Sequence, residues 1–414
     1  MILLIFLMLF LLAGCQAPQA ASPAEKAVKI AVATDLHYLA PALTDQGAYF
    51  HSFVRQGDGK VIQYIEEITD AFCAEMLEKN PDILILSGDL TLNGAVESHN
   101  ALIQKLNTLQ EAGIQVLVIP GNHDVDREYA VSFQNDSVEK VTALTSQEFL
   151  ALYEPFGPEQ AISRDAETFS YSVRVRPDLS VIALDANCFG QGFLKKGTLQ
   201  WLETQLKTAQ EENAAVITVS HQNLYAHNPL LSFGYQLYNA ADLLELLEEY
   251  GVKCHFSGHI HVQSIYSASV TEIVTASLAV SPIQYGWVEC TEDELTYHTV
   301  QTDVAGWAAE QGSTDAELLS FAEYADDFFR EIGENQVLSA FAESDLSDAE
   351  KKLLADTFNE LNAAYFAGRE PDCEALQQGI ELWSQQEGTF FLQYIKTLTD
   401  AGADRTSAVI PLKP

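Results

Sequence analysis

Apolar residues follow two alternating patterns over residues 28–303. Short runs rich in Val, Ile and Leu predict strands, and stretches with apolar residues three and four positions apart, at 61–79 and 95–111, predict helices. The predicted strands are residues 28–34, 83–87, 116–119, 169–175, 181–184, 216–219, 252–256, 264–267 and 273–276, with a further pair around Trp287 and Tyr297. Strand–helix–strand spacing predicts parallel pairing, and the closely spaced last strands predict antiparallel pairing. We therefore expect an α/β protein, a layered sandwich of mixed β-sheets flanked by helices.

The pattern changes near residue 303. Beyond it β-branched runs are rare, and Ala, Glu, Leu and Phe recur at helical spacing over 314–332, 347–366, 373–384 and 389–399. Residues 304–414 are therefore predicted to form an acidic, all-helical C-terminal extension. It either packs on the sheet domain of residues 28–303 or forms a small domain of its own.

The N-terminal sequence predicts an export signal. Residues 2–12 are uninterrupted apolar sequence, which is too short for a permanent bilayer span and suits the hydrophobic region of a signal peptide. The tetrapeptide that ends in Cys15 resembles a bacterial lipobox, in which this cysteine is lipidated. We expect a signal peptide at 1–14, a tether at 15–27, and an exported protein anchored outside the cytoplasm by lipid on Cys15. The alternative is an ordinary secretory signal.

Composition narrows the class of protein. The chain has 414 residues, 47% of them hydrophobic, and a formal net charge of −37, which excludes a disordered or fibrous protein. A surface this acidic repels polyanions, so we expect no nucleic-acid polymer as a partner. The five cysteines beyond Cys15 are too irregularly spaced for a disulfide framework or a zinc motif, although one disulfide remains possible. Composition does not indicate an oligomeric state.

Five short polar motifs follow predicted strands. They are Asp35-Leu36-His37, Gly88-Asp89, Gly121-Asn122-His123-Asp124, His221 and Gly258-His259-Ile260-His261. In an α/β sheet the loops at the carboxyl ends of the strands converge, and ligands bind there. Each motif alone is common by chance, but in this order and position they supply imidazole and oxygen ligands for two divalent ions.

This set resembles the signature of the calcineurin-like metallophosphoesterase superfamily. Within it, Gly88-Asp89-Leu90-Thr91 and Gly121-Asn122-His123-Asp124 are most similar to the class III cyclic-nucleotide phosphodiesterases. The closer likeness, to exported bacterial members with a C-terminal helical region, is carried by Asp35-Leu36-His37-Tyr38, Leu43-Thr44-Asp45 and Gln311-Gly312-Ser313-Thr314-Asp315. The superfamily motifs cover residues 28–300, so the resemblance implies a catalytic domain at 28–303.

The resemblance also implies a role for each motif residue. One metal ion would be held by Asp35, His37, Asp89 and His261, and the other by Asp89, Asn122, His221 and His259. Asp89 and a hydroxide would bridge the two ions, and His123, oriented by Asp124, would face the phosphate. One departure is the sequence His221-Gln222-Asn223, where many relatives have His-His-Pro. We expect Mn²⁺, with Fe²⁺/Fe³⁺ and Zn²⁺ as chemically suitable alternatives.

The expected chemistry is hydrolysis of a phosphodiester. Two divalent ions, two carboxylates and one hydroxide sum to about +1, which attracts an anionic diester even to an acidic protein. The hydroxide would attack in line, Asn122 would help to stabilise charge on the phosphoryl oxygens, and His123 would protonate the leaving oxygen. Further candidates for substrate contact are Asn93, Tyr38, Arg55, Asn223 and His227.

Cyclic nucleotides are the expected substrates, with the choice between 2′,3′ and 3′,5′ forms open. One alternative is a phosphomonoesterase, nucleotidase or nuclease of the same superfamily. An alternative from a different class is an exported lipoprotein that binds a metal or ligand without turnover. His123 beside Asn122 favours an enzyme, because a metal-binding protein needs no proton donor there. His99 lies in a polar helical pattern and is predicted to be exposed.

Overall fold

Two β-sheets pack face to face in the computed structural model, which describes residues 27–190, 192–400 and 404–413. Within these residues one sheet has the strand order β15-β14-β13-β1-β2-β3 and the other β11-β12-β10-β9-β8-β7-β6. The first comprises β1 (Val28–Ala33), β2 (Ile83–Ser87), β3 (Gln115–Ile119), β13 (Gln284–Cys290), β14 (Glu294–Gln301) and β15 (Ser407–Pro411). The second comprises β6 (Ser163–Arg164), β7 (Tyr171–Arg176), β8 (Leu179–Ala183), β9 (Ala215–Val219), β10 (Cys254–Ser257), β11 (Ser264–Tyr266) and β12 (Thr271–Val274). The predicted signal peptide, Cys15 and nearly all of the tether lie outside the described residues.

Both sheets are mixed, as predicted. β1, β2 and β3 run parallel while β13 pairs antiparallel with β1, and β8, β9 and β10 run parallel while β7 pairs antiparallel with β8. The expected antiparallel pairing of the last strands holds for β11 with β12 and for β13 with β14, but β12 lies parallel to β10. The fold class predicted from the sequence is confirmed.

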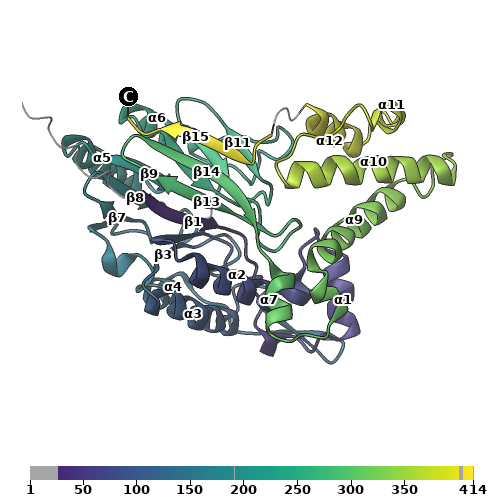
Figure 1. Ribbon diagram of the computed structural model, residues 1–414, viewed down its shortest axis with the longest axis horizontal. Helices are drawn as coiled ribbons and strands as arrows, with labels where there is room; N and C mark the ends of the chain where they lie inside the picture. Colours follow the sequence, from purple (N-terminus) through teal and green to yellow (C-terminus); the bar gives the residue numbers. More distant parts are fainter. Residues whose placement is uncertain (1–26, 191, 401–403, 414) are drawn as a thin grey trace, which may run out of the picture.

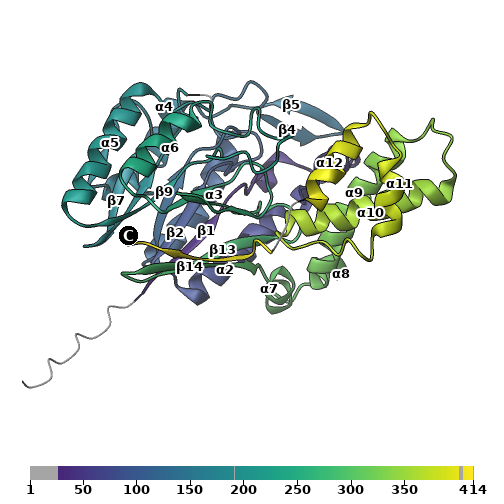
Figure 2. The ribbon, with the colours of Figure 1, turned by 90° about the horizontal axis from the view of Figure 1, so that it is seen from above.

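Helices cover the outer faces of the two sheets (Figure 2). α2 (Ile65–Lys79) and α3 (Val96–Glu111) bury Ile68, Phe72 and Leu106 in the same core as β1, β2 and β3. α5 (Lys196–Glu211) and α6 (Ala240–Glu249) bury Leu202 and Leu243 in a second core with the other sheet. β2 is buried along its whole length, which explains why its sequence is a continuous apolar run.

An insertion of short helices follows β1. It folds into η1 (Pro41–Leu43), α1 (Ala48–Arg55) and η2 (Ile62–Tyr64). α1 packs on a hairpin of β4 (Val131–Gln134) and β5 (Ser137–Lys140), with the rings of Phe50 and Phe133 5.3 Å apart. A further helix, α4 (Ser146–Leu152), follows this hairpin.

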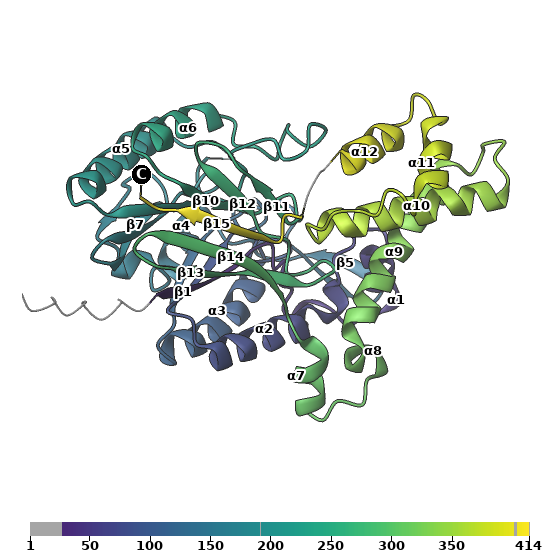
Figure 3. The ribbon, with the colours of Figure 1, turned by 45° about the horizontal axis from the view of Figure 1, so that its top comes forward.

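The C-terminal region is helical, as predicted, and projects from the end of the sandwich (Figure 1). It contains α7 (Val304–Glu310), α8 (Ala316–Leu319), α9 (Phe321–Ala340), α10 (Asp348–Phe366), α11 (Gln377–Ser384) and α12 (Phe390–Thr399). α9 to α12 share a core around Trp383, and Ile260 and Val262 from the loop after β10 insert into it. The chain then returns to the first sheet, where β15 pairs antiparallel with β14 (Figure 3). Sequence reasoning missed this edge strand.

The described helices include none that combines the length and the apolar character of a membrane span. Cys73, Cys188, Cys254, Cys290 and Cys373 all have free thiols, so the disulfide left open by the sequence is not formed.

His99 on α3 is buried, which corrects the prediction that it is exposed. Its Nδ1 lies 2.9 Å from the hydroxyl oxygen of Tyr153, and its Nε2 lies 2.9 Å from the carbonyl oxygen of Asp124. The periodicity of α3 looks polar because His99 and Ser98 face inward and satisfy their hydrogen bonds there. Burial lowers the pKa of His99 to about 4.

This buried imidazole makes stability depend on pH. An unfolded histidine titrates near pH 6.5, so between pH 6.5 and 4 the unfolded chain binds a proton that folded His99 does not, and stability is lost on acidification. We expect the free energy of unfolding to fall between pH 7 and pH 5 by about 2 kcal/mol more in the native protein than in His99→Gln. Urea denaturation at the two pH values measures this difference, and equal losses would contradict it.

Candidate functional site

Polar side chains from both sheets meet at one edge of the sandwich. Asp35 follows β1, Asp89 follows β2 and Asn122 follows β3, while His221 and His259 follow β9 and β10 of the other sheet. The carboxyl ends of these parallel strands therefore bring together residues that are far apart in the sequence. All five predicted motifs contribute to this edge.

The first cluster contains Asp35, His37, Asp89 and His261, whose candidate ligand atoms all lie within 4.8 Å of one another. Nε2 of His37 lies 3.0 Å from Nε2 of His261, which in turn lies 3.4 Å from Oδ1 of Asp35. Oδ1 of Asp35 is buried, and the described residues give it no hydrogen-bond partner. A buried carboxylate oxygen left without a donor, facing two imidazole nitrogens, is typical of a cation site.

The second cluster contains Asp89, His221 and His259, with Asn122 beside them. Nε2 of His221 lies 3.4 Å from Oδ2 of Asp89 and 3.1 Å from Oδ1 of Asn122. Asp89 thus belongs to both clusters, as a shared ligand must.

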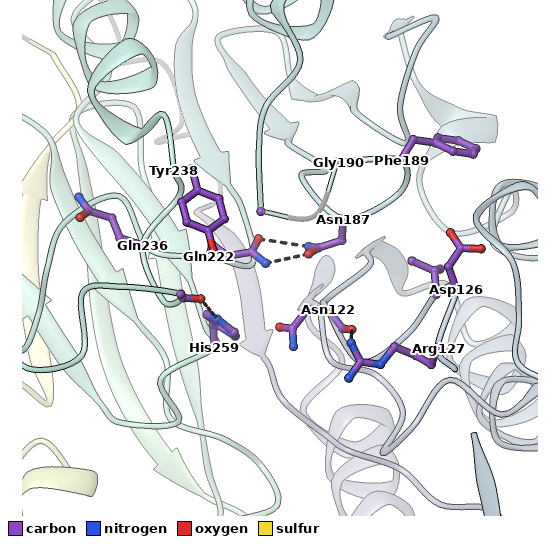
Figure 4. Close-up of a pocket in the computed structure, with 13 residues that line it drawn as sticks. Asn122, Asp126, Arg127, Asn187, Phe189, Gly190, Gln222, Gln236, Tyr238 and His259 are labelled. Carbon is purple, nitrogen blue, oxygen red and sulfur yellow. Dashed lines mark hydrogen bonds between the residues drawn. The ribbon is translucent and has the colours of Figure 1, made fainter. Parts of the chain in front are cut away.

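Backbone carbonyls fix which nitrogen of each imidazole is free in the second cluster. Nδ1 of His221 lies 2.8 Å from the carbonyl oxygen of Ser87, and Nε2 of His259 lies 2.8 Å from that of Gly234 (Figure 4). A nitrogen that donates to a carbonyl carries the proton, so the lone pairs of His221 Nε2 and His259 Nδ1 are left available for a ligand.

The loops that carry these residues are tightly constrained. Left-handed φ values occur at Asp35, His37, Asp89, His259 and His261, which lie between 46° and 72°. Such values are uncommon for residues other than glycine and gather at functional sites, where packing enforces them. The adjacent glycines allow close approach, because a Cβ at Gly258 would lie 2.0 Å from Oγ1 of Thr34 and a Cβ at Gly121 2.1 Å from N of Asp89.

The electrostatics of the cluster suit cations. Burial alone would raise the pKa of Asp35 and of Asp89, but the neighbouring His261 and His221 hold both values below the usual range. Burial lowers the pKa of His259 to about 4, whereas the charge of Asp89 overcomes burial and raises that of His221 to about 9. Buried ionised carboxylates, the neutral imidazole of His259 and the imidazole of His221, whose proton a divalent cation would displace, form a nitrogen and oxygen donor set that fits divalent cations.

His123 lies at the border of the two clusters and reaches solvent, with 30% of its side chain exposed. Its main-chain N–H donates to Oδ1 of Asp89 (2.7 Å), and its Nδ1 lies 2.8 Å from the carbonyl oxygen of Leu92. Nε2 is 4.0 Å from Oδ2 of Asp89. Leu92 therefore orients the ring and leaves Nε2 facing the clusters.

Asp124 does not orient His123, which corrects the predicted contact. Its carboxylate accepts hydrogen bonds from the main-chain N–H groups of Leu90 (3.1 Å), Thr91 (2.9 Å) and Gly121 (2.7 Å). Burial, with the charge of Asp89 added, raises the pKa of Asp124 to about 7. Asp124 thus joins the loop after β3 to the loop after β2 and positions Asp89 indirectly.

Two pockets flank the clusters. One, of about 540 Å³, includes Asn122 and His259 in its wall, and at its back the side-chain amides of Asn187 and Gln222 pair with each other at 2.7 and 3.2 Å (Figure 4). The other, of about 650 Å³, includes His123 and Asn93. The two sides of the site therefore differ in the groups they present.

Of the five predicted substrate contacts, Asn93 lines one of these two pockets and the other four line neither. Tyr38 is buried and donates a short hydrogen bond to Glu66, and Arg55 is exposed at the end of α1 outside both pockets. Asn223 donates to the carbonyl oxygen of Gly258, and Nε2 of His227 lies 2.9 Å from Oε2 of the buried Glu272. Tyr38, Asn223 and His227 face inward because their own hydrogen bonds hold them there, whereas Arg55 faces solvent.

Sequence reasoning missed other residues that line the pockets. They are Asp58, Lys60, Arg127, Tyr129, Asn187, Phe189, Gln222, Gln236 and Tyr238. Position 222 carried a usable signal, since Gln222 directly follows the predicted ligand His221. The others lie on loops whose path no local pattern indicates.

Comparison with known proteins agrees with this site. Residues 28–263 match the model of the calcineurin-like phosphoesterase family, which covers more than half of the chain. The fold is a two-sheet sandwich whose two ligand clusters share a carboxylate, which is the site of a dinuclear metallohydrolase. The chain belongs to the calcineurin-like phosphoesterase family. Residues 303–404 match the model of a C-terminal domain of cyclic nucleotide phosphodiesterase. The predicted superfamily is confirmed.

Individual relatives are distant. The chain is 26% identical over 185 residues, or 44% of its length, to a probable cyclic nucleotide phosphodiesterase of Moraxella catarrhalis, of which the match covers 59%. It is 26% identical over 54% of its length to a glycerophosphodiester phosphodiesterase of Enterobacter lignolyticus, of which 69% is covered. A solved dimetal phosphatase from Danio rerio matches with a TM-score of 0.45 and 12% identity over 66% of this chain and 96% of its own.

Proposed function

We propose that this protein hydrolyses phosphodiesters at a dinuclear metal centre, with cyclic nucleotides as its substrates. The observation that carries the proposal is the position of Asp89, shared by the two ligand clusters, with His123 beside it. A metal-storage or structural site needs no exposed imidazole held at its border by a carbonyl. An exported binding protein without turnover is therefore the less favoured candidate.

Different residues of the site would bind the metal ions, transfer the proton and contact the phosphoryl group. Asp35, His37, Asp89 and His261 would hold one divalent cation, and Asp89, Asn122, His221 and His259 the other. When bound, such cations polarise the phosphoryl oxygens and lower the pKa of water towards neutrality. His123 carries a proton at Nε2 to the leaving oxygen, and the amide of Asn122 contacts the phosphoryl group.

The preference for cyclic nucleotides is supported by the relatives. Residues 303–404 match a domain defined in cyclic nucleotide phosphodiesterases, and several relatives are named as probable members of that class. The similarity to glycerophosphodiester phosphodiesterases makes an aliphatic diester the second candidate substrate. The net charge of −37 disfavours polymeric nucleic acid.

We extend the proposal to the metal and to the location. The nitrogen and oxygen donor set suits Mn²⁺, which we favour over Fe and Zn²⁺. Residues 2–12 and Cys15 support export and attachment to the membrane by lipid. The mass of the purified protein, compared with that of Cys15→Ser, tests the lipid, and an unmodified cysteine would contradict it.

A substrate panel tests the activity. Protein stripped with a chelator and reloaded with Mn²⁺, Fe²⁺ or Zn²⁺ is assayed on bis-p-nitrophenyl phosphate, 2′,3′- and 3′,5′-cyclic AMP, glycerophosphoethanolamine and p-nitrophenyl phosphate. We expect diesters to be hydrolysed faster than the monoester, with cyclic AMP preferred over the aliphatic diester and Mn²⁺ giving the highest rate. Preference for the monoester would identify a phosphomonoesterase, and no turnover with any metal would favour the binding protein.

A further inference from the structure

The pocket beside His123 has an aromatic wall that the proposed chemistry does not use. α1 contributes Phe53 and β4 contributes Phe133, with ring centroids 4.7 Å apart, and Tyr129 stands just before β4. Phe53 is 44% exposed and Tyr129 55% exposed. Exposed rings that border a cavity of about 650 Å³ next to a reacting group are available for stacking.

The wall is held in place from two sides. The guanidinium of Arg127 lies over the Tyr129 ring at 4.1 Å, and its Nη1 donates to the carbonyl oxygen of Asn122 (2.6 Å), which ties this ring to the ligand loop. The other side of the aromatic pocket is formed by the residues that follow α1, and this segment packs against the C-terminal region. Gly59 packs so closely on Phe329 of α9 that an added Cβ would lie 2.7 Å from the ring.

The pocket also has a polar end. Asn93 is 6% exposed, and its Nδ2 donates to the carbonyl oxygen of Val131 (3.0 Å), which leaves Oδ1 without a partner among the described residues. Asp58 and Lys60 form an ion pair in the same wall. Aromatic surface with a charged pair at its edge matches a nucleoside, which has a flat base and polar edge groups.

The two pockets are not equivalent with respect to the reaction. His123 lines the aromatic pocket, whereas Asn122 and His259 line the other. In hydrolysis the phosphorus–oxygen bond to water forms, the bond to the leaving oxygen breaks, the leaving oxygen takes the proton of His123, and water gives one proton to solvent. The group attached to the leaving oxygen therefore lies on the His123 side.

We propose that the aromatic pocket of Phe53, Tyr129 and Phe133 binds the leaving group of the substrate, and that this group is a nucleoside whose base stacks on Phe53 and Tyr129. The assignment rests on the proposed function for the direction of the reaction. A cyclic nucleotide carries both ester oxygens on one ribose, so its whole nucleoside occupies this pocket. The pocket of Asn187 and Gln222 then holds no part of a cyclic substrate.

Kinetics and equilibrium binding test the assignment. Phe53→Ala and Tyr129→Ala are expected to raise KM for 3′,5′-cyclic AMP about 10-fold each, because stacking on one aromatic ring contributes that much to binding, while kcat changes little. Phe53→Trp keeps a stacking surface and should retain the native KM. The control is Phe390→Ala, since Phe390 is 60% exposed on α12 and lines neither pocket.

Adenosine separates this assignment from the proposed function, because it has no phosphate and its binding requires no turnover. Saturation-transfer NMR of the protein loaded with diamagnetic Zn²⁺ should detect adenosine, with dissociation constants about 10-fold higher for Phe53→Ala and Tyr129→Ala than for Phe390→Ala. If cyclic AMP is hydrolysed and both substitutions leave KM and adenosine binding unchanged, the leaving-group pocket is wrong and the hydrolase stands. If adenosine binds as expected but no diester is hydrolysed, the nucleoside pocket stands and the hydrolase is wrong.

Discussion

Asp89→Asn is expected to abolish diester hydrolysis, lowering kcat by more than about 10³-fold, and to reduce the metal content of the protein. Asp89 belongs to both ligand clusters, so its carboxylate serves two cations at once. An amide is neutral and offers one acceptor oxygen, which cannot replace a bridging anion. Plasma mass spectrometry of the Mn²⁺-loaded variant, beside its kcat on bis-p-nitrophenyl phosphate, measures both effects.

The control must exclude a backbone effect, because Asp89 has a φ of 48°. Asp136 offers a matched substitution, since it has a φ of 57° and lies in the turn between β4 and β5. Asparagine tolerates this left-handed region about as well as aspartate, so neither change strains the main chain. Asp136→Asn should keep the native rate and metal content. Native metal content in Asp89→Asn would show that Asp89 is not a shared ligand.

Buried strands were predictable because a strand that is buried on both faces consists of a continuous run of apolar residues. β2 and β3 are continuous apolar runs, and their positions agree with the prediction to within one residue. β15 escaped prediction because it is a half-exposed edge strand that pairs with β14, so only one of its residues is buried. His99 was wrongly predicted to be exposed. Its ring is buried because two polar partners satisfy its nitrogens, and a hydropathy pattern carries no information about such partners.

Within the site, too, some residues were predictable from the sequence and others were not. Its ligand residues were predictable because each follows a strand end, and parallel strands bring their carboxyl ends to one edge. The substrate contacts were not, because the direction of a loop side chain depends on tertiary partners. His227 turns inward to Glu272, and Tyr38 turns inward to Glu66. Phe53 lies in the insertion after β1, and the helical turn of α1 is what places it in a pocket.

The C-terminal region is coupled to the site by packing. Ile260 stands between the two candidate ligands His259 and His261, and it is buried in the core that α9 to α12 form around Trp383. The same region supports the insertion, because Nε2 of Gln63 donates to the hydroxyl of Tyr324 (2.9 Å). The helices therefore hold both a ligand loop and one wall of the aromatic pocket.

His123→Ala is expected to lower kcat on 3′,5′-cyclic AMP by about 10²- to 10⁴-fold while the protein keeps its metal ions. His123 belongs to neither ligand cluster, and Leu92 rather than a cation holds its ring. Its removal takes away the proton donor and leaves the ligands in place. Measuring kcat and metal content together therefore distinguishes the two substitutions. His123→Ala should lower kcat alone, whereas Asp89→Asn should lower both kcat and metal content. Loss of metal from His123→Ala would contradict the assigned role.

The leaving group provides the decisive comparison for His123. A ribose oxygen departs as a poor alkoxide and needs a proton as its bond to phosphorus breaks, whereas p-nitrophenolate is stable without one. His123→Ala should therefore lose at least about 10-fold more rate on cyclic AMP than on bis-p-nitrophenyl phosphate. His51→Ala is the control, because His51 is exposed on α1 and lines neither pocket. An equal loss on both substrates would mean that His123 binds the phosphoryl group and does not transfer the proton.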